Sequence, residues 1–225
     1  MKPQRKVITR APHRSVGLVH EPWFQNEPIQ HESMLEKRCI EALLLTPDVV
    51  KIESQPLTLI FNVDGREFSY TPDLRVTLQD GGQALVEAKG APFKKKFRDR
   101  LDAGLKAALQ ELRIPLYLVS SEQIDEERGA RIAELRSLAK RTVPPDAIDA
   151  LLDWFRTRSS PTVGDAEEAG FPLAHVAYAV GRRLLTVGPS FDLAPSQPLS
   201  TITAYEHIHL DYWLGYPGRS ENVAA

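Results

Sequence analysis

Residues 70–89 read Y-T-P-D-L-R-V-T-L-Q-D-G-G-Q-A-L-V-E-A-K, and this stretch decides the fold of the sequence around it. Its two apolar runs, at 74–78 and 84–86, are separated by Asp80-Gly81-Gly82. Apolar runs on either side of an Asp-Gly pair are typical of two antiparallel strands joined by a tight turn. The stretch therefore predicts a β-hairpin.

Three charged side chains stand at one end of this predicted hairpin. Asp73 begins the first strand, whereas Glu87 and Lys89 end the second and point the same way, because side chains alternate faces along a strand. Antiparallel pairing can then bring Asp73 next to that pair. Two carboxylates are ligands that Mg²⁺ prefers, and a lysine beside them can steady an attacking water or offset transition-state charge.

The same residues also have a purely structural interpretation. Glu and Lys alternate on the solvated faces of many strands, and an Asp after a Pro often opens a turn. Glu87 and Lys89, however, follow the apolar residues 84–86 rather than a pattern of alternating polarity. This position at the end of a core strand favours a chemical site.

Composition places the chain among ordinary globular proteins. Its length of 225 residues is enough for one large domain or two small ones. Its content of 42% hydrophobic and 26% charged residues is ordinary for a globular protein. The net charge of −2 gives no global basic signal, so any nucleic-acid contact must rest on local patches. The single cysteine, Cys39, excludes an intrachain disulfide and is expected to be a small buried helix residue.

Hydropathy gives no sign of a membrane protein. No apolar run approaches the ~20 residues that a membrane span needs, and the N-terminus lacks the apolar core of a signal peptide. We therefore expect an intracellular, cytoplasmic protein without a membrane partner.

Residues 1–30 are predicted to form a basic N-terminal arm. No acid precedes Glu21, and five basic residues do: Lys2, Arg5, Lys6, Arg10 and Arg14. Such an arm suits a phosphate backbone, with Arg5, Lys6 and Arg10 as candidate DNA contacts, but a solvated tail has the same composition.

Residues 31–45 have apolar positions at helical spacing, and Pro47 ends the predicted helix. Ser33 and Glu36 have the S-x-x-E form of a capping box, in which Glu36 satisfies a backbone N–H at the helix start. Alternatively, Glu36 leans toward the charged cluster as a third carboxylate. The spacing leaves both roles open.

Further strands and a crossover complete the predicted sheet. Strands are expected at 49–52, 57–63 and 66–70, the last two joined by Asp64-Gly65 as a second hairpin. Leucines at helical spacing predict a helix over 101–112, before a buried strand at 115–120. A helix between two strands of one sheet makes a crossover unit, so the fold class is α/β with a mixed sheet flanked by helices.

A basic run precedes the crossover helix, close to the proposed metal site. Its candidate DNA contacts are Lys94, Lys95, Lys96 and Arg98, which would grip phosphates beside the scissile bond. Runs of this kind are also common on solvated faces.

The ordered set of motifs resembles a known family. Glu32-Ser33-x-x-Glu36, Val49-Val50 leading to Gln55-Pro56, Tyr70-Thr71-Pro72-Asp73 and Val86-Glu87-Ala88-Lys89 are similar to motifs of the PD-(D/E)xK nuclease superfamily. More narrowly, they resemble the N-terminal domain of TnsA, the endonuclease subunit of Tn7-like heteromeric transposases. The resemblance covers roughly residues 15 to 120 and implies a restriction-endonuclease-like fold.

The resemblance also implies a site and a reaction. Glu36, Asp73, Glu87 and Lys89 match the family's catalytic residues, with the Ala88 carbonyl as an extra ligand for Mg²⁺ or Mn²⁺. TnsA-like proteins hydrolyse a phosphodiester at the 5′ ends of the transposon in double-stranded DNA. A TnsB-like DDE transposase cuts and joins the 3′ ends, and a TnsC-like ATP-dependent regulator controls both. Because Lys89 would lie beside two carboxylates, we expect an electrostatic role rather than a general base.

The C-terminal part is predicted to be a separate, mainly helical domain. A helix over 124–140 and a linker at 142–145 precede helices over 146–158 and 173–185, with Thr162 capping a short helix between them. A flap over 186–201 completes a pattern typical of a winged helix-turn-helix. His175, Tyr178, Arg182 and Arg183 would face DNA, Arg182 and Arg183 as direct contacts, or the same helices form a protein-docking domain.

These predictions give four segments and three functional hypotheses. The segments are a basic arm (1–30), a nuclease core (31–121), a connecting helix and linker (122–145) and a winged-helix-like domain (146–225). The chain is a transposon-end endonuclease, a stand-alone restriction, repair or junction nuclease of the same fold, or a catalytically silent DNA-binding adaptor.

Overall fold

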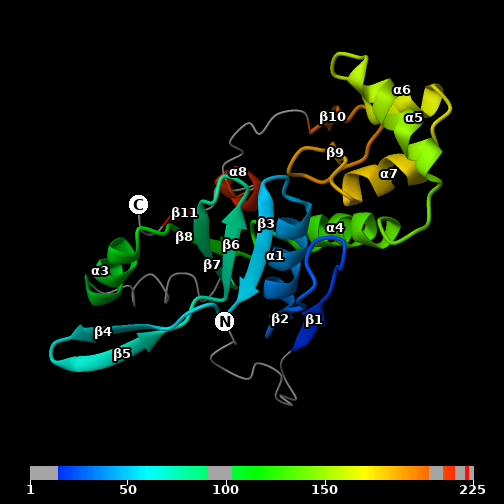
Figure 1. The fold of residues 1–225 in the computed structure, drawn as a ribbon. Helices are drawn as coiled ribbons and strands as arrows, with labels where there is room; N and C mark the ends of the chain where they lie inside the picture. The colour runs from blue at the N-terminus through cyan, green and yellow to red at the C-terminus, as the bar shows by residue number, and fades with distance from the viewer. Residues whose placement is uncertain (1–14, 91–102, 203–209, 216–220, 223–225) are drawn as a thin grey trace. The chain divides into compact units, whose positions relative to one another are not determined.

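The hairpin lies within a five-stranded mixed sheet in the computed structural model, which describes residues 15–90, 103–202, 210–215 and 221–222 (Figure 1). The strand order is β11-β8-β7-β6-β3. These strands are β3 (Val49–Ser54), β6 (Leu74–Leu78), β7 (Gln83–Lys89), β8 (Leu116–Ser120) and β11 (Glu221–Asn222). The predicted α/β class with a mixed sheet is confirmed.

The turn between β6 and β7 follows from its sequence. Gly81 has a φ of +86°, a conformation that residues with a Cβ rarely adopt, and the N–H of Gly82 donates to Asp80 Oδ1 at 2.7 Å. The two strands pair antiparallel, with Leu74 opposite Val86 and Val76 opposite Ala84. The predicted hairpin is therefore confirmed.

β7 and β8 run parallel, which requires a crossover. Helix α3 (Ala103–Leu112) lies between them in the chain, and Val86 is opposite Tyr117 in the parallel register. β7 is apolar and buried from Ala84 to Val86, as expected for a central strand. The crossover unit predicted from the leucine spacing is confirmed.

A second hairpin precedes the central one. β4 (Leu59–Val63) and β5 (Arg66–Tyr70) pair antiparallel as a two-stranded sheet of their own and extend away from the five-stranded sheet (Figure 1). Asp64 and Gly65 both have positive φ, as a tight hairpin turn requires. The base of this hairpin packs through Leu59 and Tyr70 against a buried core cluster of Leu85, Leu109 and Leu116.

Helix α1 (Met34–Leu45) supplies much of the core of this part of the chain. Ile40, Leu43 and Leu44 are fully buried. Cys39 is also fully buried, as its position in the helical pattern predicts.

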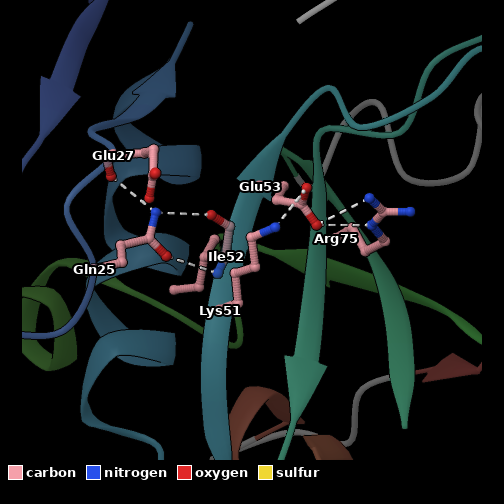
Figure 2. A network of polar contacts seen from close by, with 6 residues as sticks. All are labelled: Gln25, Glu27, Lys51, Ile52, Glu53 and Arg75. Carbon is pink, nitrogen blue, oxygen red and sulfur yellow. Dashed lines mark hydrogen bonds and ion pairs between the residues drawn. The ribbon is translucent and has the colours of Figure 1, made fainter. Parts of the chain in front are cut away.

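The outer edge of β3 is covered by the N-terminal segment. β1 (Gly17–Val19) and β2 (Ile29–His31) pair antiparallel, and Gln25 lies between them in the chain. The Gln25 side chain bonds to β3 as a neighbouring strand would (Figure 2). Gln25 Oε1 accepts from the Ile52 N–H at 3.0 Å, and its Nε2 donates to the Ile52 carbonyl at 3.1 Å. A primary amide thus satisfies both backbone groups at an otherwise unpaired edge position.

We expect Gln25→Ala to lower the free energy of unfolding by about 1–3 kcal/mol, because it leaves the N–H and C=O of a buried strand residue unsatisfied. Gln30→Ala is the matched control, since Gln30 bonds to Ser54 through its backbone rather than its side chain. Urea unfolding of the two variants measures the difference. Equal stability of both variants would contradict this role of Gln25.

A charged cluster lies on β3 and β6 next to this edge (Figure 2). Glu53 pairs with Lys51 at 3.1 Å and with Arg75 Nη2 at 2.9 Å. Burial raises the pKa of the Glu53 carboxyl, but the two cations outweigh it and hold the pKa below its ordinary value. Glu53 is therefore ionised and paired at neutral pH.

The described chain separates into two compact units. Within the described residues, unit 1 comprises 15–44, 48–90, 103–124, 210–215 and 221–222, and unit 2 comprises 45–47 and 125–202. The described residues 210–215 and 221–222 thus group with the sheet, whereas the sequence predicts one domain over 146–225. The reason is that β11 pairs with the outer edge of β8 and helix α8 (Leu210–Gly215) lies beside β8.

Unit 2 is mainly helical. Its helices are α4 (Glu126–Leu138), α5 (Pro145–Arg156), α6 (Val163–Glu168) and α7 (Leu173–Gly181), and β9 (Leu185–Thr186) pairs antiparallel with β10 (Ser200–Thr201). Thr162 caps α6, as predicted, and the structure adds a full capping box with Asp165. No helix among the described residues is long and apolar enough to cross a membrane.

Helix α7 is shorter than the sequence predicts. It ends at Gly181 instead of residue 185, because Arg183 adopts a φ of +57°. The Leu184 N–H donates to the Ala179 carbonyl at 2.8 Å and the Arg183 N–H to Val180 at 2.9 Å, a helix stop that usually places glycine at this position. A non-glycine residue there gives no sequence signal for the helix end.

Candidate active site

Asp73, Glu87 and Lys89 meet at one end of the central hairpin. Asp73 lies immediately before β6, and Glu87 and Lys89 are in the last three residues of β7. Because Leu74 is opposite Val86, the neighbours Asp73 and Glu87 face each other just beyond the last paired residues. The hairpin register alone brings together the three side chains.

Hydrogen bonds fix both carboxylates. The Ala88 N–H donates to Asp73 Oδ2 at 2.8 Å, and the Asp73 N–H donates to Glu87 Oε2 at 3.3 Å. The Tyr70 hydroxyl donates to the same Oε2 atom at 2.8 Å. Lys89 Nζ forms an ion pair with the other oxygen, Glu87 Oε1.

The site is only partly open to water. The Glu87 side chain is 3% exposed, whereas that of Lys89 is 32% exposed. Ion pairs in a partly dry environment are stronger than at a free surface, because water screens them less. The buried Glu87 carboxylate therefore accepts from protein donors on one oxygen, and the more exposed Lys89 amine pairs with the other.

Burial raises the pKa of the Asp73 carboxyl well above its ordinary value, and the neighbouring Glu87 charge raises this pKa further. Lys89 and the Ala88 N–H oppose the shift, whereas Glu36 adds to it. Two close carboxylates that repel each other gain stability from any cation placed between them.

Burial lowers the pKa of the Lys89 amine, but the charges of Glu87, Asp73 and Glu36 outweigh burial and raise it above its ordinary value. Lys89 therefore stays protonated at neutral pH. A protonated amine can orient water and offset negative charge, but it cannot accept a proton.

The Ala88 carbonyl is directed toward the same place. Within a strand the N–H and C=O of one residue point to the same side, and the Ala88 N–H points at Asp73. Three residues earlier in β7, the Leu85 N–H donates instead to the Pro115 carbonyl, just before β8, as the alternation requires. Ala88 thus presents a backbone oxygen at the edge where the two carboxylates meet.

Glu36 caps its helix. Its Oε2 accepts from the Glu32 N–H at 2.7 Å, its Oε1 accepts from the Ser33 hydroxyl at 3.0 Å, and its N–H donates to Ser33 at 3.1 Å. Of the two roles that the sequence left open for Glu36, the structure shows the capping role, and the backbone N–H that Glu36 satisfies is that of Glu32. Glu36 nevertheless lies near enough to act electrostatically on Asp73 and Lys89.

Among the described residues, no three or more Asp, Glu, His or Cys side chains are gathered in a group that could hold a metal ion. The expected set of Glu36, Asp73 and Glu87 is thus not brought together as three ligands, because Glu36 is turned to the helix start. The donors that fit a divalent cation are the Asp73 and Glu87 carboxylates with the Ala88 carbonyl. Mg²⁺ is commonly held by one or two carboxylates, with water and phosphate oxygens completing its coordination.

The predicted DNA contacts are mostly outside the described residues: Arg5, Lys6, Arg10, Lys94, Lys95, Lys96 and Arg98. Arg182 and Arg183 are described and follow α7 rather than lying on it. Arg183 donates to the Thr46 carbonyl at 3.0 Å, and the Arg182 guanidinium lies 5.5 Å from the centre of the Tyr178 ring. Both side chains make contacts within unit 2.

Two neighbours of the site were missed by the sequence analysis. Tyr70 bonds to Glu87, and Gln55 donates its N–H to the Asp73 carbonyl at 2.8 Å from a backbone with a φ of +44°. Gln55 Nε2 also reaches Glu32 Oε1 at 3.4 Å, which links Asp73 to the start of α1. The sequence signal that could have found them is their position in the family-like motifs. Tyr70 begins the motif that ends at Asp73, and Gln55 precedes Pro56 in another.

No protein-family model matches the sequence, and no curated protein is found to be similar to it.

Proposed function

We propose that this protein is a Mg²⁺-dependent DNA endonuclease that nicks the 5′ ends of a Tn7-like transposon beside a DDE transposase. The observation that carries the proposal is the meeting of Asp73, Glu87 and Lys89 at one end of the sheet, with Asp73 fixed by the Ala88 N–H. Two carboxylates, a backbone oxygen and a protonated amine are suited to phosphodiester hydrolysis.

The order of elements supports a restriction-endonuclease-like fold. Helix α1 is followed by β3, β6 and β7, then by α3 and β8, with the β4–β5 hairpin inserted before β6. The sheet places β7 between an antiparallel and a parallel neighbour, so the end of β7 is central rather than at an edge. This order agrees with the PD-(D/E)xK resemblance of the motifs that the strands carry.

Each residue has a role that its contacts support. Asp73, Glu87 and the Ala88 carbonyl would hold the cation, and Lys89 would orient the attacking water and offset charge on the phosphate. A bound Mg²⁺ would activate water and shield the leaving 3′-oxygen. Glu36 would add negative potential and fix the start of α1 rather than bind the ion directly.

The helices of unit 2, followed by the β9–β10 pair, support a winged-helix-like domain that engages DNA or the regulator. We infer that double-stranded transposon ends, a TnsB-like transposase and a TnsC-like ATP-dependent regulator are the partners. The basic residues of the N-terminal arm and of the run at 94–98 would contact DNA phosphates.

The experiment is nicking of a labelled DNA carrying transposon ends, by the protein with the transposase encoded beside its gene. We expect 5′-strand nicking with Mg²⁺ or Mn²⁺ that is lost with EDTA and in Asp73→Ala. Cleavage by the protein alone would favour a stand-alone nuclease instead. Equal cleavage with wild type and Asp73→Ala would make the chain a silent adaptor and overturn the proposal.

A further inference from the structure

Tyr70 connects the β4–β5 hairpin to the carboxylates. It is the last residue of β5, and its ring packs at the base of the hairpin against the cluster of Leu85, Leu109 and Leu116. Its hydroxyl donates to Glu87 Oε2 at 2.8 Å. A carboxylate only accepts hydrogen bonds, so the Tyr70 hydroxyl is the donor in this bond.

The donors around Glu87 distinguish its two oxygens. Oε2 accepts from Tyr70 at 2.8 Å and from the Asp73 N–H at 3.3 Å, whereas Oε1 pairs with Lys89. The last torsion of a Glu side chain has only broad preferences of its own, so its carboxylate orientation depends on such partners. The Tyr70 bond is the shorter of the two at Oε2.

We infer that Tyr70 is a positioning residue that holds the Glu87 carboxylate with Oε1 toward Lys89 and the cation site. The inference rests on the proposed function, because Glu87 must be a ligand for its orientation to matter. Hydrogen-bond partners of metal ligands typically change metal affinity 10–100-fold when they are removed. Tyr70 would thus set the affinity of the site without touching the ion.

The simpler alternative is that Tyr70 only anchors the hairpin through its ring. Tyr70→Phe separates the two roles, because phenylalanine keeps the ring against the core cluster and loses only the hydroxyl. Tyr117→Phe is the matched control, since Tyr117 is on β8 of the same sheet and its electrostatic neighbour is Asp211.

The experiment is a titration of the metal-free proteins with Mn²⁺, in which electron paramagnetic resonance measures free Mn²⁺. We expect Tyr70→Phe to weaken Mn²⁺ binding about 10–100-fold and Tyr117→Phe to leave it unchanged. Circular dichroism of each metal-free variant verifies folding. Wild-type affinity in a folded Tyr70→Phe would overturn the inference, whatever its melting temperature.

The Asp73→Asn variant distinguishes failure of the inference about Tyr70 from failure of the proposed function. If wild type binds Mn²⁺ and Asp73→Asn does not, the site stands, and the result for Tyr70→Phe decides the inference alone. If wild type itself binds no Mn²⁺, both the inference and the proposed function are overturned.

Discussion

Asp73→Asn should remove nicking and, at the same time, stabilise the metal-free protein. We expect at least about 1,000-fold slower nicking, because one of the two proposed carboxylate ligands is lost. We also expect a melting temperature higher by about 2–4 °C, which corresponds to about 1 kcal/mol for a chain of this size. The gain arises because burial disfavours the charge of Asp73 and because Glu87 repels it. Asparagine relieves this repulsion and keeps a carbonyl oxygen for the Ala88 N–H.

The pH dependence of this gain has a definite sign. The folded-state pKa of Asp73 lies above its ordinary value of 3.8, so the folded protein holds this proton more tightly than the unfolded chain. Wild type therefore loses stability relative to Asp73→Asn as pH rises from about 3.8 through the raised pKa. Differential scanning calorimetry at several pH values measures the difference. A variant that is less stable than wild type at pH 8 without metal would contradict this electrostatic interpretation.

Lys89→Met should lower both activity and stability. Removal of the amine leaves the Glu87 carboxylate, which is 3% exposed, without its ion-pair partner. Breaking a buried pair from one side costs about 3–5 kcal/mol, and we expect about 3 kcal/mol here because Lys89 is 32% exposed. Loss of the charge that we propose faces the phosphate should slow nicking by about 100-fold or more.

A double variant provides the control for Lys89→Met. Adding Glu87→Gln removes the unpaired charge, so most of the lost stability should return, whereas nicking should remain at least as slow as in Lys89→Met. Chemical denaturation of the two single variants and the double variant measures the coupling. Equal destabilisation in Lys89→Met and in the double variant would show that the Glu87–Lys89 pair is not the source of the effect.

The elements that sequence reasoning predicted are those with local causes. Asp80-Gly81-Gly82 and Asp64-Gly65 specify tight turns, which fix the registers of β6–β7 and β4–β5. The β6–β7 register in turn places Asp73 beside Glu87. Ser33 and Glu36 likewise form a local cap.

The features that sequence reasoning missed depend on distant contacts. β11 is two residues long and pairs with β8 about one hundred residues earlier in the chain, without a strand pattern to signal it. The bond from Tyr70 to Glu87 depends on how the inserted hairpin packs at its base. The choice of Glu36 between capping and ligation could not be made from spacing, because both roles use the same side chain at the same position.

Location of Mn²⁺ in a crystal by anomalous scattering tests the central claim most directly, since the claim is that Asp73 and Glu87 together bind a divalent cation. We predict one strong anomalous peak with oxygens of Asp73 and Glu87 as direct ligands, absent from Asp73→Asn crystals. A well-ordered wild-type site without such a peak, or with Mn²⁺ bound only elsewhere, would contradict the claim.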